Sequence, residues 1–506
     1  MKKIFIYIAT VSVLTFSSCK DFLDVEPIDK LTGNNFFKSA ADVEANINNL
    51  SLMLFNKVDE THFLGSVGEY RSGQVKSEPF AAVNAPAKVF IDLLAQNKLL
   101  DALQTGTAWD NYNLSRITNW KNYFQVIQGA GILISRLNEG VPGVSETQKK
   151  QFLGEAAFAR CYAYFVMVRL FGDVPYYNDP FHIEPLAREN MVSVLNRCIA
   201  DMSMYKDGLP WTYDDPTKIG VRAGRGSAVA LLMHMNMWNA GFDTDNGKYY
   251  QAVAKLGGEL VASNAFTLLP INQWETVIKG RSRESLFEFY RSINYSEASN
   301  PQASVADMFL HYPFKKPYYQ WVLSSAYYRA PYMRKIFPET VSDDRKTEWF
   351  QNIYANEGNF MLIKYAQNVY SQVGSDATTP DNAVLIFRYA DAILLRAEAL
   401  AELGENAEAL KMLAMVRGRA NAEPYNGVGQ DLKEFIFAER ARELFGEGQL
   451  YFDLVRTKRI LSPDWTTYPL NLDQFNRGGW TWPIASSALN NNPYMVLNSY
   501  WLNGGV

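Results

Sequence analysis

The sequence predicts a mainly α protein, with a scaffold of tetratricopeptide-type helical hairpins and an irregular, loop-rich remainder. Helical periodicity is strong before residue 240 and after residue 380. Between 241 and 380 it weakens, and Gly, Pro, Ser, Asn and aromatic residues dominate. Of the 506 residues, 48% are hydrophobic and 20% are charged, so the chain can bury a large core.

The first nineteen residues have the features of a lipoprotein signal. Two lysines precede an apolar stretch at 4–14, which is shorter than the roughly 20 apolar residues of a membrane span. Two serines then stand before Cys19, the pattern that a lipoprotein signal peptidase cleaves. Two or more acyl chains on Cys19 would anchor the protein stably. We therefore expect a signal peptide over 1–18 and palmitate-type lipidation at Cys19; an ordinary secretory signal is the alternative.

Four helices are expected in the first half of the chain, where apolar residues recur at three- and four-residue spacing. The strongest pattern lies between Leu153 and Phe171, and Gly172 and Pro175 then prevent the helix from continuing. The expected helices cover residues 41–55, 120–137, 153–171 and 226–238.

The second half contains a predicted helical hairpin, 384–403 and 407–420, with its turn at Gly404. Alignment to the tetratricopeptide pattern puts Ala397 and Ala409 at the small positions that let paired helices approach closely.

A further pair of helices is expected after this hairpin. Asp431 and Glu434 form a predicted capping box for the first of them, which would end at Gly446. Residues 449–459 are its expected partner.

The sequence contains no motif that points to catalysis. It has no GxSxG elbow, no HExxH, no Walker loop and no CxxC, and its four histidines are scattered singly. The calcium-like run from Asp243 to Gly247 has Ala254 where an EF-hand needs glutamate, so we expect no metal and no cofactor. A glycoside hydrolase stays an alternative, because 53 acidic residues offer many carboxylate pairs.

Two other compositional features limit the function. The formal net charge is −4 and the sequence has no basic run, so nothing in its charge pattern indicates nucleic-acid binding. Cys161 and Cys198 lie in apolar helical stretches, so we expect buried free thiols.

Six segments in order resemble the SusD/RagB family of nutrient-binding outer-membrane lipoproteins, across nearly the whole mature length. They are CKDFLDVEP from Cys19, FVMVRLFGDVPYY from Phe165, GRGSAVALLMHM from Gly224, IFRYADAILLRAEALAELG from Ile386, ERARELFGEGQLYFDLVRTKR from Glu439, and WPIASSALNNNPYMVLNSYW from Trp482.

The resemblance implies a tetratricopeptide-type helical scaffold whose irregular remainder carries the ligand site. It also implies a non-enzymatic lipoprotein, anchored in the outer membrane and facing the exterior, that passes an oligosaccharide to a SusC-like TonB-dependent transporter. An oligopeptide ligand, as in RagB-like members, is the alternative. We expect three parts: an N-terminal part over 19–240, an irregular insertion over 241–380 and a C-terminal helical part over 381–506. Together they should form one compact unit over 19–506.

The strongly matching motifs are expected to be scaffold rather than ligand site. Their charged residues should orient helices through ion pairs. These residues are Arg169 with Asp173, and Glu439, Arg442, Glu443 and Arg456.

Sugar recognition needs flat aromatic rings for the C–H face of a pyranose and planar polar groups for its hydroxyls. Two regions outside the scaffold helices combine these groups, one around 69–71 and 109–113, the other over 312–332. The candidate ligand-binding residues are Tyr70, Arg71, Trp109, Asp110, Asn111, Tyr112, Tyr319, Trp321 and Tyr327. The alternative is that these rings pack the irregular part or face the transporter.

Overall fold

The computed structural model is mostly helical, which confirms the predicted fold class. Within the described residues, strands form only short antiparallel pairs. The signal segment, Cys19 and the loop 109–112 lie outside these residues. The structure describes residues 37–58, 62–79, 85–106, 113–292, 305–370, 378–490, 492–502 and 504–505.

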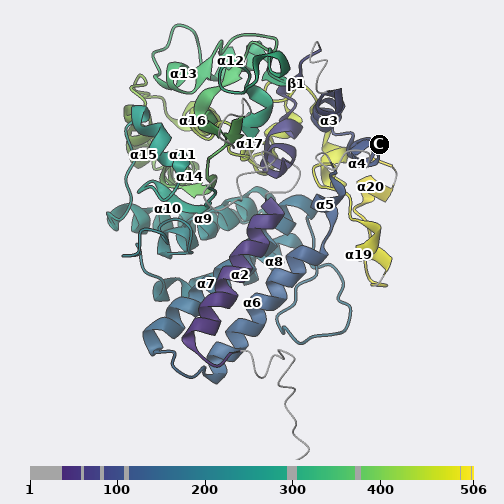
Figure 1. Cartoon of the computed structure of the whole chain (residues 1–506), viewed down its shortest axis with the longest axis vertical. Coiled ribbons are helices and arrows are strands. Elements are labelled where there is room, and N and C mark those ends of the chain that lie inside the picture. Colours follow the sequence, from purple (N-terminus) through teal and green to yellow (C-terminus); the bar gives the residue numbers. More distant parts are fainter. Residues whose placement is uncertain are drawn as a thin grey trace, which may run out of the picture.

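The N-terminal half is a bundle around one central helix. α2 (Ala40–Val58), α6 (Lys121–Glu139) and α8 (Met191–Tyr205) pack against α7 (Glu146–Phe171), as Figure 1 shows in its lower half. Every residue of α7 from 152 to 171 is buried, because the helix is covered on all sides. This bundle confirms the helices expected near 41–55, 120–137 and 153–171.

The ends of α7 follow from its flanking residues. Ser145 accepts a hydrogen bond from the backbone N–H of Gln148, and the Gln148 side chain caps Ser145 in return, so the helix begins earlier than its apolar pattern. Gly172 ends it with φ +74°, a conformation that favours glycine.

Two helical hairpins stack in the other half. α9 (Arg225–Phe242) packs against α10 (Gly247–Ala262), and α14 (Tyr389–Glu402) packs against α15 (Asn406–Arg419). α10 also packs against α14, which joins the hairpins. α9 and α15 confirm expected helices, whereas α10 falls in the range that was expected to be irregular.

Small residues allow the close approach of these helices. Ala397 of α14 and Ala409 of α15 are fully buried, as the tetratricopeptide alignment predicted. Gly257 of α10 faces the stem of Arg396, where an added Cβ would lie 2.8 Å from the Arg396 Cβ. The hairpins therefore stack at a distance that larger residues would not permit.

One expected helix begins with a strand. Residues 384–388 form β8 (Val384–Arg388), which pairs antiparallel with β2 (Ser285–Phe289). All residues of both strands are buried, so the sequence shows a continuous apolar run rather than alternation, and such a run does not distinguish strand from helix. The prediction of a helix from 384 was therefore wrong in its first turn.

The predicted capping box at Asp431 is also wrong. α16 (Gly429–Glu443) begins two residues earlier, with Val428 at its N-cap and no side-chain cap, so Asp431 lies in the first turn. A helix expected over 449–459 is confirmed as α17 (Leu450–Arg456).

The remaining elements are short. The strand pairs are β1 (Val75–Ser77) with β3 (Ala326–Tyr328), β4 (Phe350–Gln351) with β5 (Met361–Leu362), and β6 (Asn368–Tyr370) with β7 (Thr378–Pro380). The other helices are α3 (Ala85–Ala95), α4 (Leu99–Gly106), α5 (Ser115–Thr118), α11 (Trp274–Lys279), α12 (Ala330–Ile336), α13 (Arg345–Glu348), α18 (Leu472–Asn476), α19 (Ser486–Asn490) and α20 (Ser499–Leu502).

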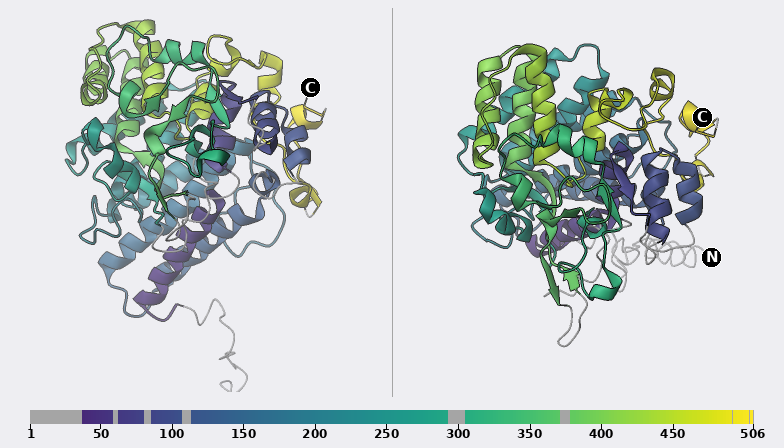
Figure 2. Two further views of the ribbon diagram at one scale, coloured as in Figure 1. Left: turned by 45° about the horizontal axis from the view of Figure 1, so that its top comes forward. Right: turned by 90° about the horizontal axis from the view of Figure 1, so that it is seen from above.

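Segments from the two ends of the chain lie side by side. The right-hand view of Figure 2 shows the C-terminal segment beside α3 and α4. Asn97, just before α4, donates through Nδ2 to the carbonyl oxygen of Gly479 at 2.9 Å. In the part of the chain that the structure describes, no helix is both long and apolar enough to cross a bilayer.

Candidate functional site

The most exposed aromatic side chains of the second candidate region lie in one loop, residues 311–322, called here the aromatic loop. Tyr318 is 59% exposed, Tyr319 is 73% exposed and Tyr312 is 42% exposed. Trp321 is partly buried. Aromatic rings are costly to leave in water, so such a group marks a candidate binding surface.

Backbone hydrogen bonds close this loop on itself. The N–H of Tyr312 donates to the carbonyl oxygen of Trp321 at 2.9 Å, and the N–H of Trp321 donates to that of Tyr318 at 3.0 Å. The peptide bonds before Pro313 and Pro317 are both cis. The rings are therefore carried by a bonded frame rather than by an open chain.

A buried lysine fixes the tryptophan of the loop. The Nζ of Lys315 lies 3.6 Å from the centroid of the Trp321 ring and 2.8 Å from Asp307 Oδ1. It also donates to the Asp307 carbonyl oxygen at 3.0 Å. Asp307 neutralises the ammonium of Lys315, which in turn orients the indole of Trp321. Because the indole is already ordered, a ligand that binds to it would cost less side-chain conformational entropy.

Two tyrosines of the loop form a second fixed pair. The rings of Tyr312 and Tyr318 meet edge to face, with centroids 5.3 Å apart and an interplanar angle of 88°. Tyr319 and Gln320 are exposed beside them, with Gln320 Nε2 3.5 Å from Tyr319 Oη. The loop thus presents rings and a planar amide together.

The remaining tyrosines of the region, Tyr327, Tyr328 and Tyr332, are buried. Tyr327, a predicted ligand residue, is 3% exposed on β3, opposite Lys76 of β1. Tyr328 is fully buried and donates to Glu69 Oε2 at 2.8 Å. Tyr327 is therefore corrected to a packing position, because every residue of β3 is buried.

Tyr70 and Arg71 also require correction. Tyr70 is fully buried and Arg71 is 3% exposed, in a π-turn followed by a 3-10 turn. The Arg71 guanidinium donates to Asn97 Oδ1 at 2.6 Å and stacks 4.3 Å from the ring centroid of Tyr451. It joins segments of the core. The burial of Tyr70 and Arg71 is not evident from the sequence, because an irregular segment without helical periodicity resembles an exposed loop.

The rest of the first candidate group lies outside the described residues. This applies to Trp109, Asp110, Asn111 and Tyr112, and to Cys19. Tyr319 and Trp321 are the predicted ligand residues that the structure places at least partly at the surface.

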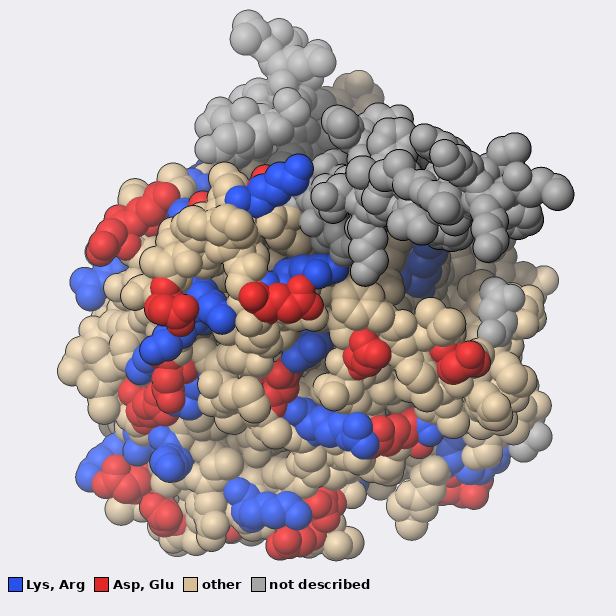
Figure 3. Space-filling view, turned by 90° about the horizontal axis from the view of Figure 1, so that it is seen from below, with Lys and Arg blue, Asp and Glu red and all other residues tan. Residues whose placement is uncertain are grey.

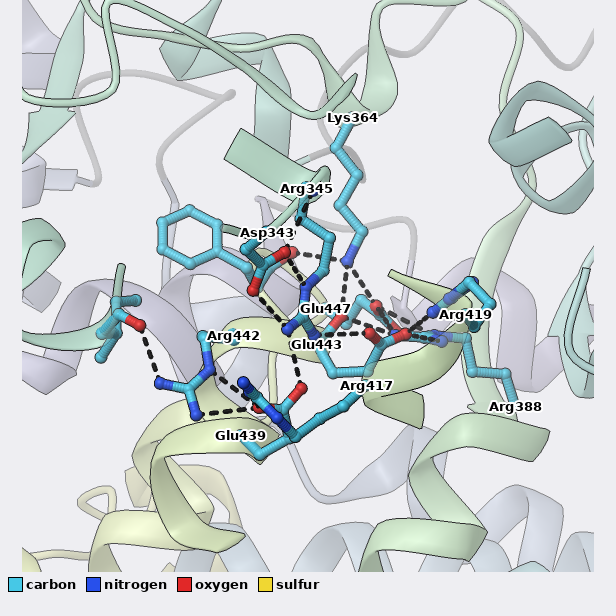
Figure 4. A network of polar contacts seen from close by, with 12 residues as sticks. Asp343, Arg345, Lys364, Arg388, Arg417, Arg419, Glu439, Arg442, Glu443 and Glu447 are labelled. Atoms are coloured by element: carbon cyan, nitrogen blue, oxygen red, sulfur yellow. Dashed lines mark hydrogen bonds and ion pairs between the residues drawn. The ribbon is translucent and has the colours of Figure 1, made fainter. Parts of the chain in front are cut away.

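The charged residues of the matching motifs form a buried ion-pair network, shown in Figure 4. Glu443 of α16 accepts from Arg345 Nη1 at 2.9 Å and Arg388 Nη1 at 2.7 Å, and it also pairs with Arg419. Glu439 pairs with Arg345 at 2.7 Å. The side chains of Arg345, Arg388, Glu439 and Glu443 are all 0% exposed.

The network joins elements that are far apart in the sequence. Lys364 donates through Nζ to Glu447 Oε1 at 2.6 Å and to the carbonyl oxygen of Glu443 at 3.0 Å. Arg388 reaches Glu284 Oε1 at 2.9 Å. Burial opposes ionisation of these acids, but the surrounding cations lower the pKa of Glu443 well below its usual range. The carboxylates of the network hold helices together, as expected for scaffold residues.

The same holds for Arg456 but not for the expected pair of Arg169 and Asp173. Arg456 binds Glu398 Oε1 at 2.5 Å and Asp453 Oδ1 at 2.7 Å. Arg169 instead stacks on two aromatic rings, those of Phe165 at 4.1 Å and Phe452 at 4.2 Å.

Asp173 has a separate structural role. Its Oδ1 accepts from the N–H of Met191 at 2.9 Å, where α8 begins. The ion pair between Arg169 and Asp173 is therefore a wrong prediction.

Other polar groups of interest have structural partners. His234 Nε2 lies 2.6 Å from Asp391 Oδ2 in the core, and Asp243 and Asp245 both pair with Lys248 at 3.2 Å. Cys161 and Cys198 are buried free thiols, as expected. Among the described residues, no group of His, Cys, Asp or Glu side chains has the arrangement of a metal site.

Comparisons with known proteins agree with this architecture. A family profile described as "SusD family" matches residues 316–501, and one described as "Starch-binding associating with outer membrane" matches residues 21–236. The solved structure of a SusD homologue from Bacteroides thetaiotaomicron is 34% identical. It has a TM-score of 0.83, with 92% of this chain and 98% of that chain covered.

More distant relatives match over similar lengths. A curated SusD-like protein, P38 of Formosa agariphila, is 23% identical, with 97% of each chain covered. A solved structure named as a laminarin-binding SusD-like protein is 18% identical, with a TM-score of 0.70 and coverage of 91% of this chain and 99% of that one.

Proposed function

The chain belongs to the SusD family, and from this premise we propose that it captures a glycan at the aromatic loop without cleaving it. It then delivers the glycan to a SusC-like TonB-dependent transporter in the outer membrane. Its anchor is an acylated Cys19, and it faces the cell exterior. The observation that carries the proposal is the group of exposed rings on a bonded loop, Tyr312, Tyr318, Tyr319 and Trp321.

The chemistry of these rings fits a sugar. A pyranose packs its C–H face on a flat ring, and its hydroxyls need amide or charged groups close by. Tyr319 offers an open ring, and the neighbouring Gln320 offers an exposed amide. A relative whose name states that it binds laminarin supports a glycan as the class of ligand.

The charges around the loop favour capture over hydrolysis. Hydrolysis of a glycoside needs an acid and a second carboxylate placed across the bond. In the described part of the loop region, Asp307 pairs with Lys315 at 2.8 Å. The loop's own segment, 311–322, contains no Asp or Glu.

The placement of α2, the first described helix, suits a tether at that end of the molecule. Figure 1 shows the beginning of α2 at the bottom of the molecule and β1, which pairs with β3, near the top. A lipid on Cys19 would hold the lower end near the membrane. Figure 3 shows that acidic and basic side chains are intermixed where they are visible on the face seen from below, with no field of one sign.

A panel of polysaccharides that includes starch and laminarin tests the proposal by affinity electrophoresis. We expect one glycan to retard the native protein and Tyr318→Ala to weaken that retardation about tenfold, the effect of losing about 1.4 kcal/mol of contact energy. Tyr494→Ala is the matched control, because Tyr494 is also 59% exposed but lies outside the loop. If every glycan that binds retards the native protein and Tyr318→Ala equally, Tyr318 is not part of the site. If the protein binds peptides but no glycan, the proposal is wrong.

A further inference from the structure

A second concave site lies away from the aromatic loop, between the end of α9 and the C-terminal segment. Its cavity has a volume of about 560 Å³, within the roughly 300–1,000 Å³ of small-molecule sites. The walls come from the end of α9 and the turn after it, from Lys458 just after α17, and from the segment around α18. They include Phe242, Thr244, Lys458, Phe475, Asn476 and Arg477.

Lys458 is held in this cavity by aromatic rings. Its Nζ lies 3.9 Å from the ring centroid of Phe242 and 4.3 Å from that of Phe475. The two rings are nearly parallel, with an interplanar angle of 10° and centroids 6.0 Å apart. The backbone of Lys458 has φ +62°, which L-residues rarely adopt.

The ammonium of Lys458 has no acidic partner among the described residues. No carboxylate of these residues lies within 4.0 Å of its Nζ. Burial alone lowers the pKa of this lysine to about 8. A half-buried cation without an anion is unfavourable, and rings compensate for only part of its lost hydration.

The other charged groups of the cavity already have partners. Asp243 accepts from Tyr249 Oη at 2.9 Å and pairs with Lys248. Arg477 pairs with Asp473 at 3.2 Å, and Asp173 accepts from the backbone at the start of α8. Lys458 is therefore the charge in this cavity that an incoming anion would neutralise.

We infer that this cavity binds a carboxylate-bearing sugar unit, a hexuronate, with its carboxylate on Lys458. The exposed amide of Asn476 and the hydroxyl of Thr244 line the same cavity. They supply the planar and hydroxylic partners that ring hydroxyls need. The site is independent of the aromatic loop and of the glycan proposed there.

Calorimetric titration with D-glucuronate, D-glucose and acetate at pH 7 tests the inference. We expect the native protein to bind glucuronate at least tenfold more tightly than glucose or acetate. The affinity falls between pH 7 and pH 9, because the ammonium loses its proton near pH 8. Equal binding of glucuronate and glucose would overturn the carboxylate contact, and equal binding of acetate and glucuronate would overturn the assignment to a sugar.

Matched variants assign the effect to this lysine. Lys458→Met keeps the apolar stem and should lose at least tenfold in glucuronate affinity. Lys335→Met is the control, since the Nζ of Lys335 also lies over a ring, 3.9 Å from the Trp465 centroid, but donates to the Asp464 carbonyl oxygen.

The same titrations separate this site from the aromatic loop. Tyr318→Ala should leave glucuronate binding unchanged, so failure of the loop proposal and failure of this one are distinguishable. Unaltered glucuronate affinity in Lys458→Met, with a native melting curve, would contradict the inference.

Discussion

Glu443→Gln is expected to lower the free energy of unfolding at neutral pH by about 3–5 kcal/mol, the typical cost of removing one partner from a buried ion pair. Glu443 balances Arg345, Arg388 and Arg419 at the centre of the network. A neutral amide leaves those guanidinium groups in the core with too little negative charge. Denaturant unfolding followed by circular dichroism measures the difference.

The surface pair of Glu408 and Lys411 provides the control for this substitution. It is also a carboxylate–cation contact, but both of its side chains are exposed to water on α15. We expect Glu408→Gln to leave the unfolding midpoint unchanged, because exposed pairs contribute little. Equal destabilisation by the two substitutions would contradict the role given to the buried network.

The same network predicts how stability depends on pH. Burial opposes ionisation of Glu439, but the nearby Arg345, Arg442 and Arg417 lower its pKa to about 2, from 4.5 in the unfolded chain. The unfolded chain therefore binds more protons below about pH 4.5, and stability falls as pH drops from there towards 2. In Glu443→Gln this acid-induced loss should be smaller than in the native protein.

Gly68→Ala is expected to lower the free energy of unfolding by about 3 kcal/mol, the upper range for overpacking a core. An added Cβ would lie 1.9 Å from the carbonyl oxygen of Gly448 and 2.3 Å from its carbonyl carbon. The two segments are also tied by the N–H of Gly448, which donates to Glu69 Oε1 at 2.8 Å. Backbone meets backbone here, so no side chain can move aside.

Gly418→Ala is the matched control for that substitution. Gly418 lies inside α15, and an added Cβ there meets nothing within 4 Å. Alanine favours a helix interior over glycine by up to about 1 kcal/mol, so this variant should be slightly more stable than the native protein. A melting temperature for Gly68→Ala equal to that of the native protein would contradict the close crossing.

The helices were predictable wherever apolar residues recur at three- and four-residue spacing, as in α6 and α7. The strand β8 was not, because its apolar run is buried on both faces and its partner β2 lies about a hundred residues earlier in the chain. Pairing between distant segments is information that local spacing does not contain.

The candidate site was predictable only in part. A dense aromatic segment indicated the region around Tyr319 and Trp321, but composition did not separate these rings from Tyr327, which faces inward on β3. Tyr70 and Arg71 were misplaced for a related reason: π- and 3-10 turns have no periodicity, so a buried irregular segment resembles a surface loop. The Lys458 cavity had no local signal, since its walls come from distant segments.

The most direct test of glycan capture is calorimetric titration of the best glycan from the panel into native protein and into Tyr319→Ala/Trp321→Ala. The account predicts saturable binding by the native protein, at least about 30-fold weaker binding by the double variant, an unchanged melting curve and intact glycan after the titration. Equal affinity of the two proteins would contradict glycan capture at this loop. Shortened glycan chains in the calorimeter cell after titration with native protein would contradict capture without cleavage.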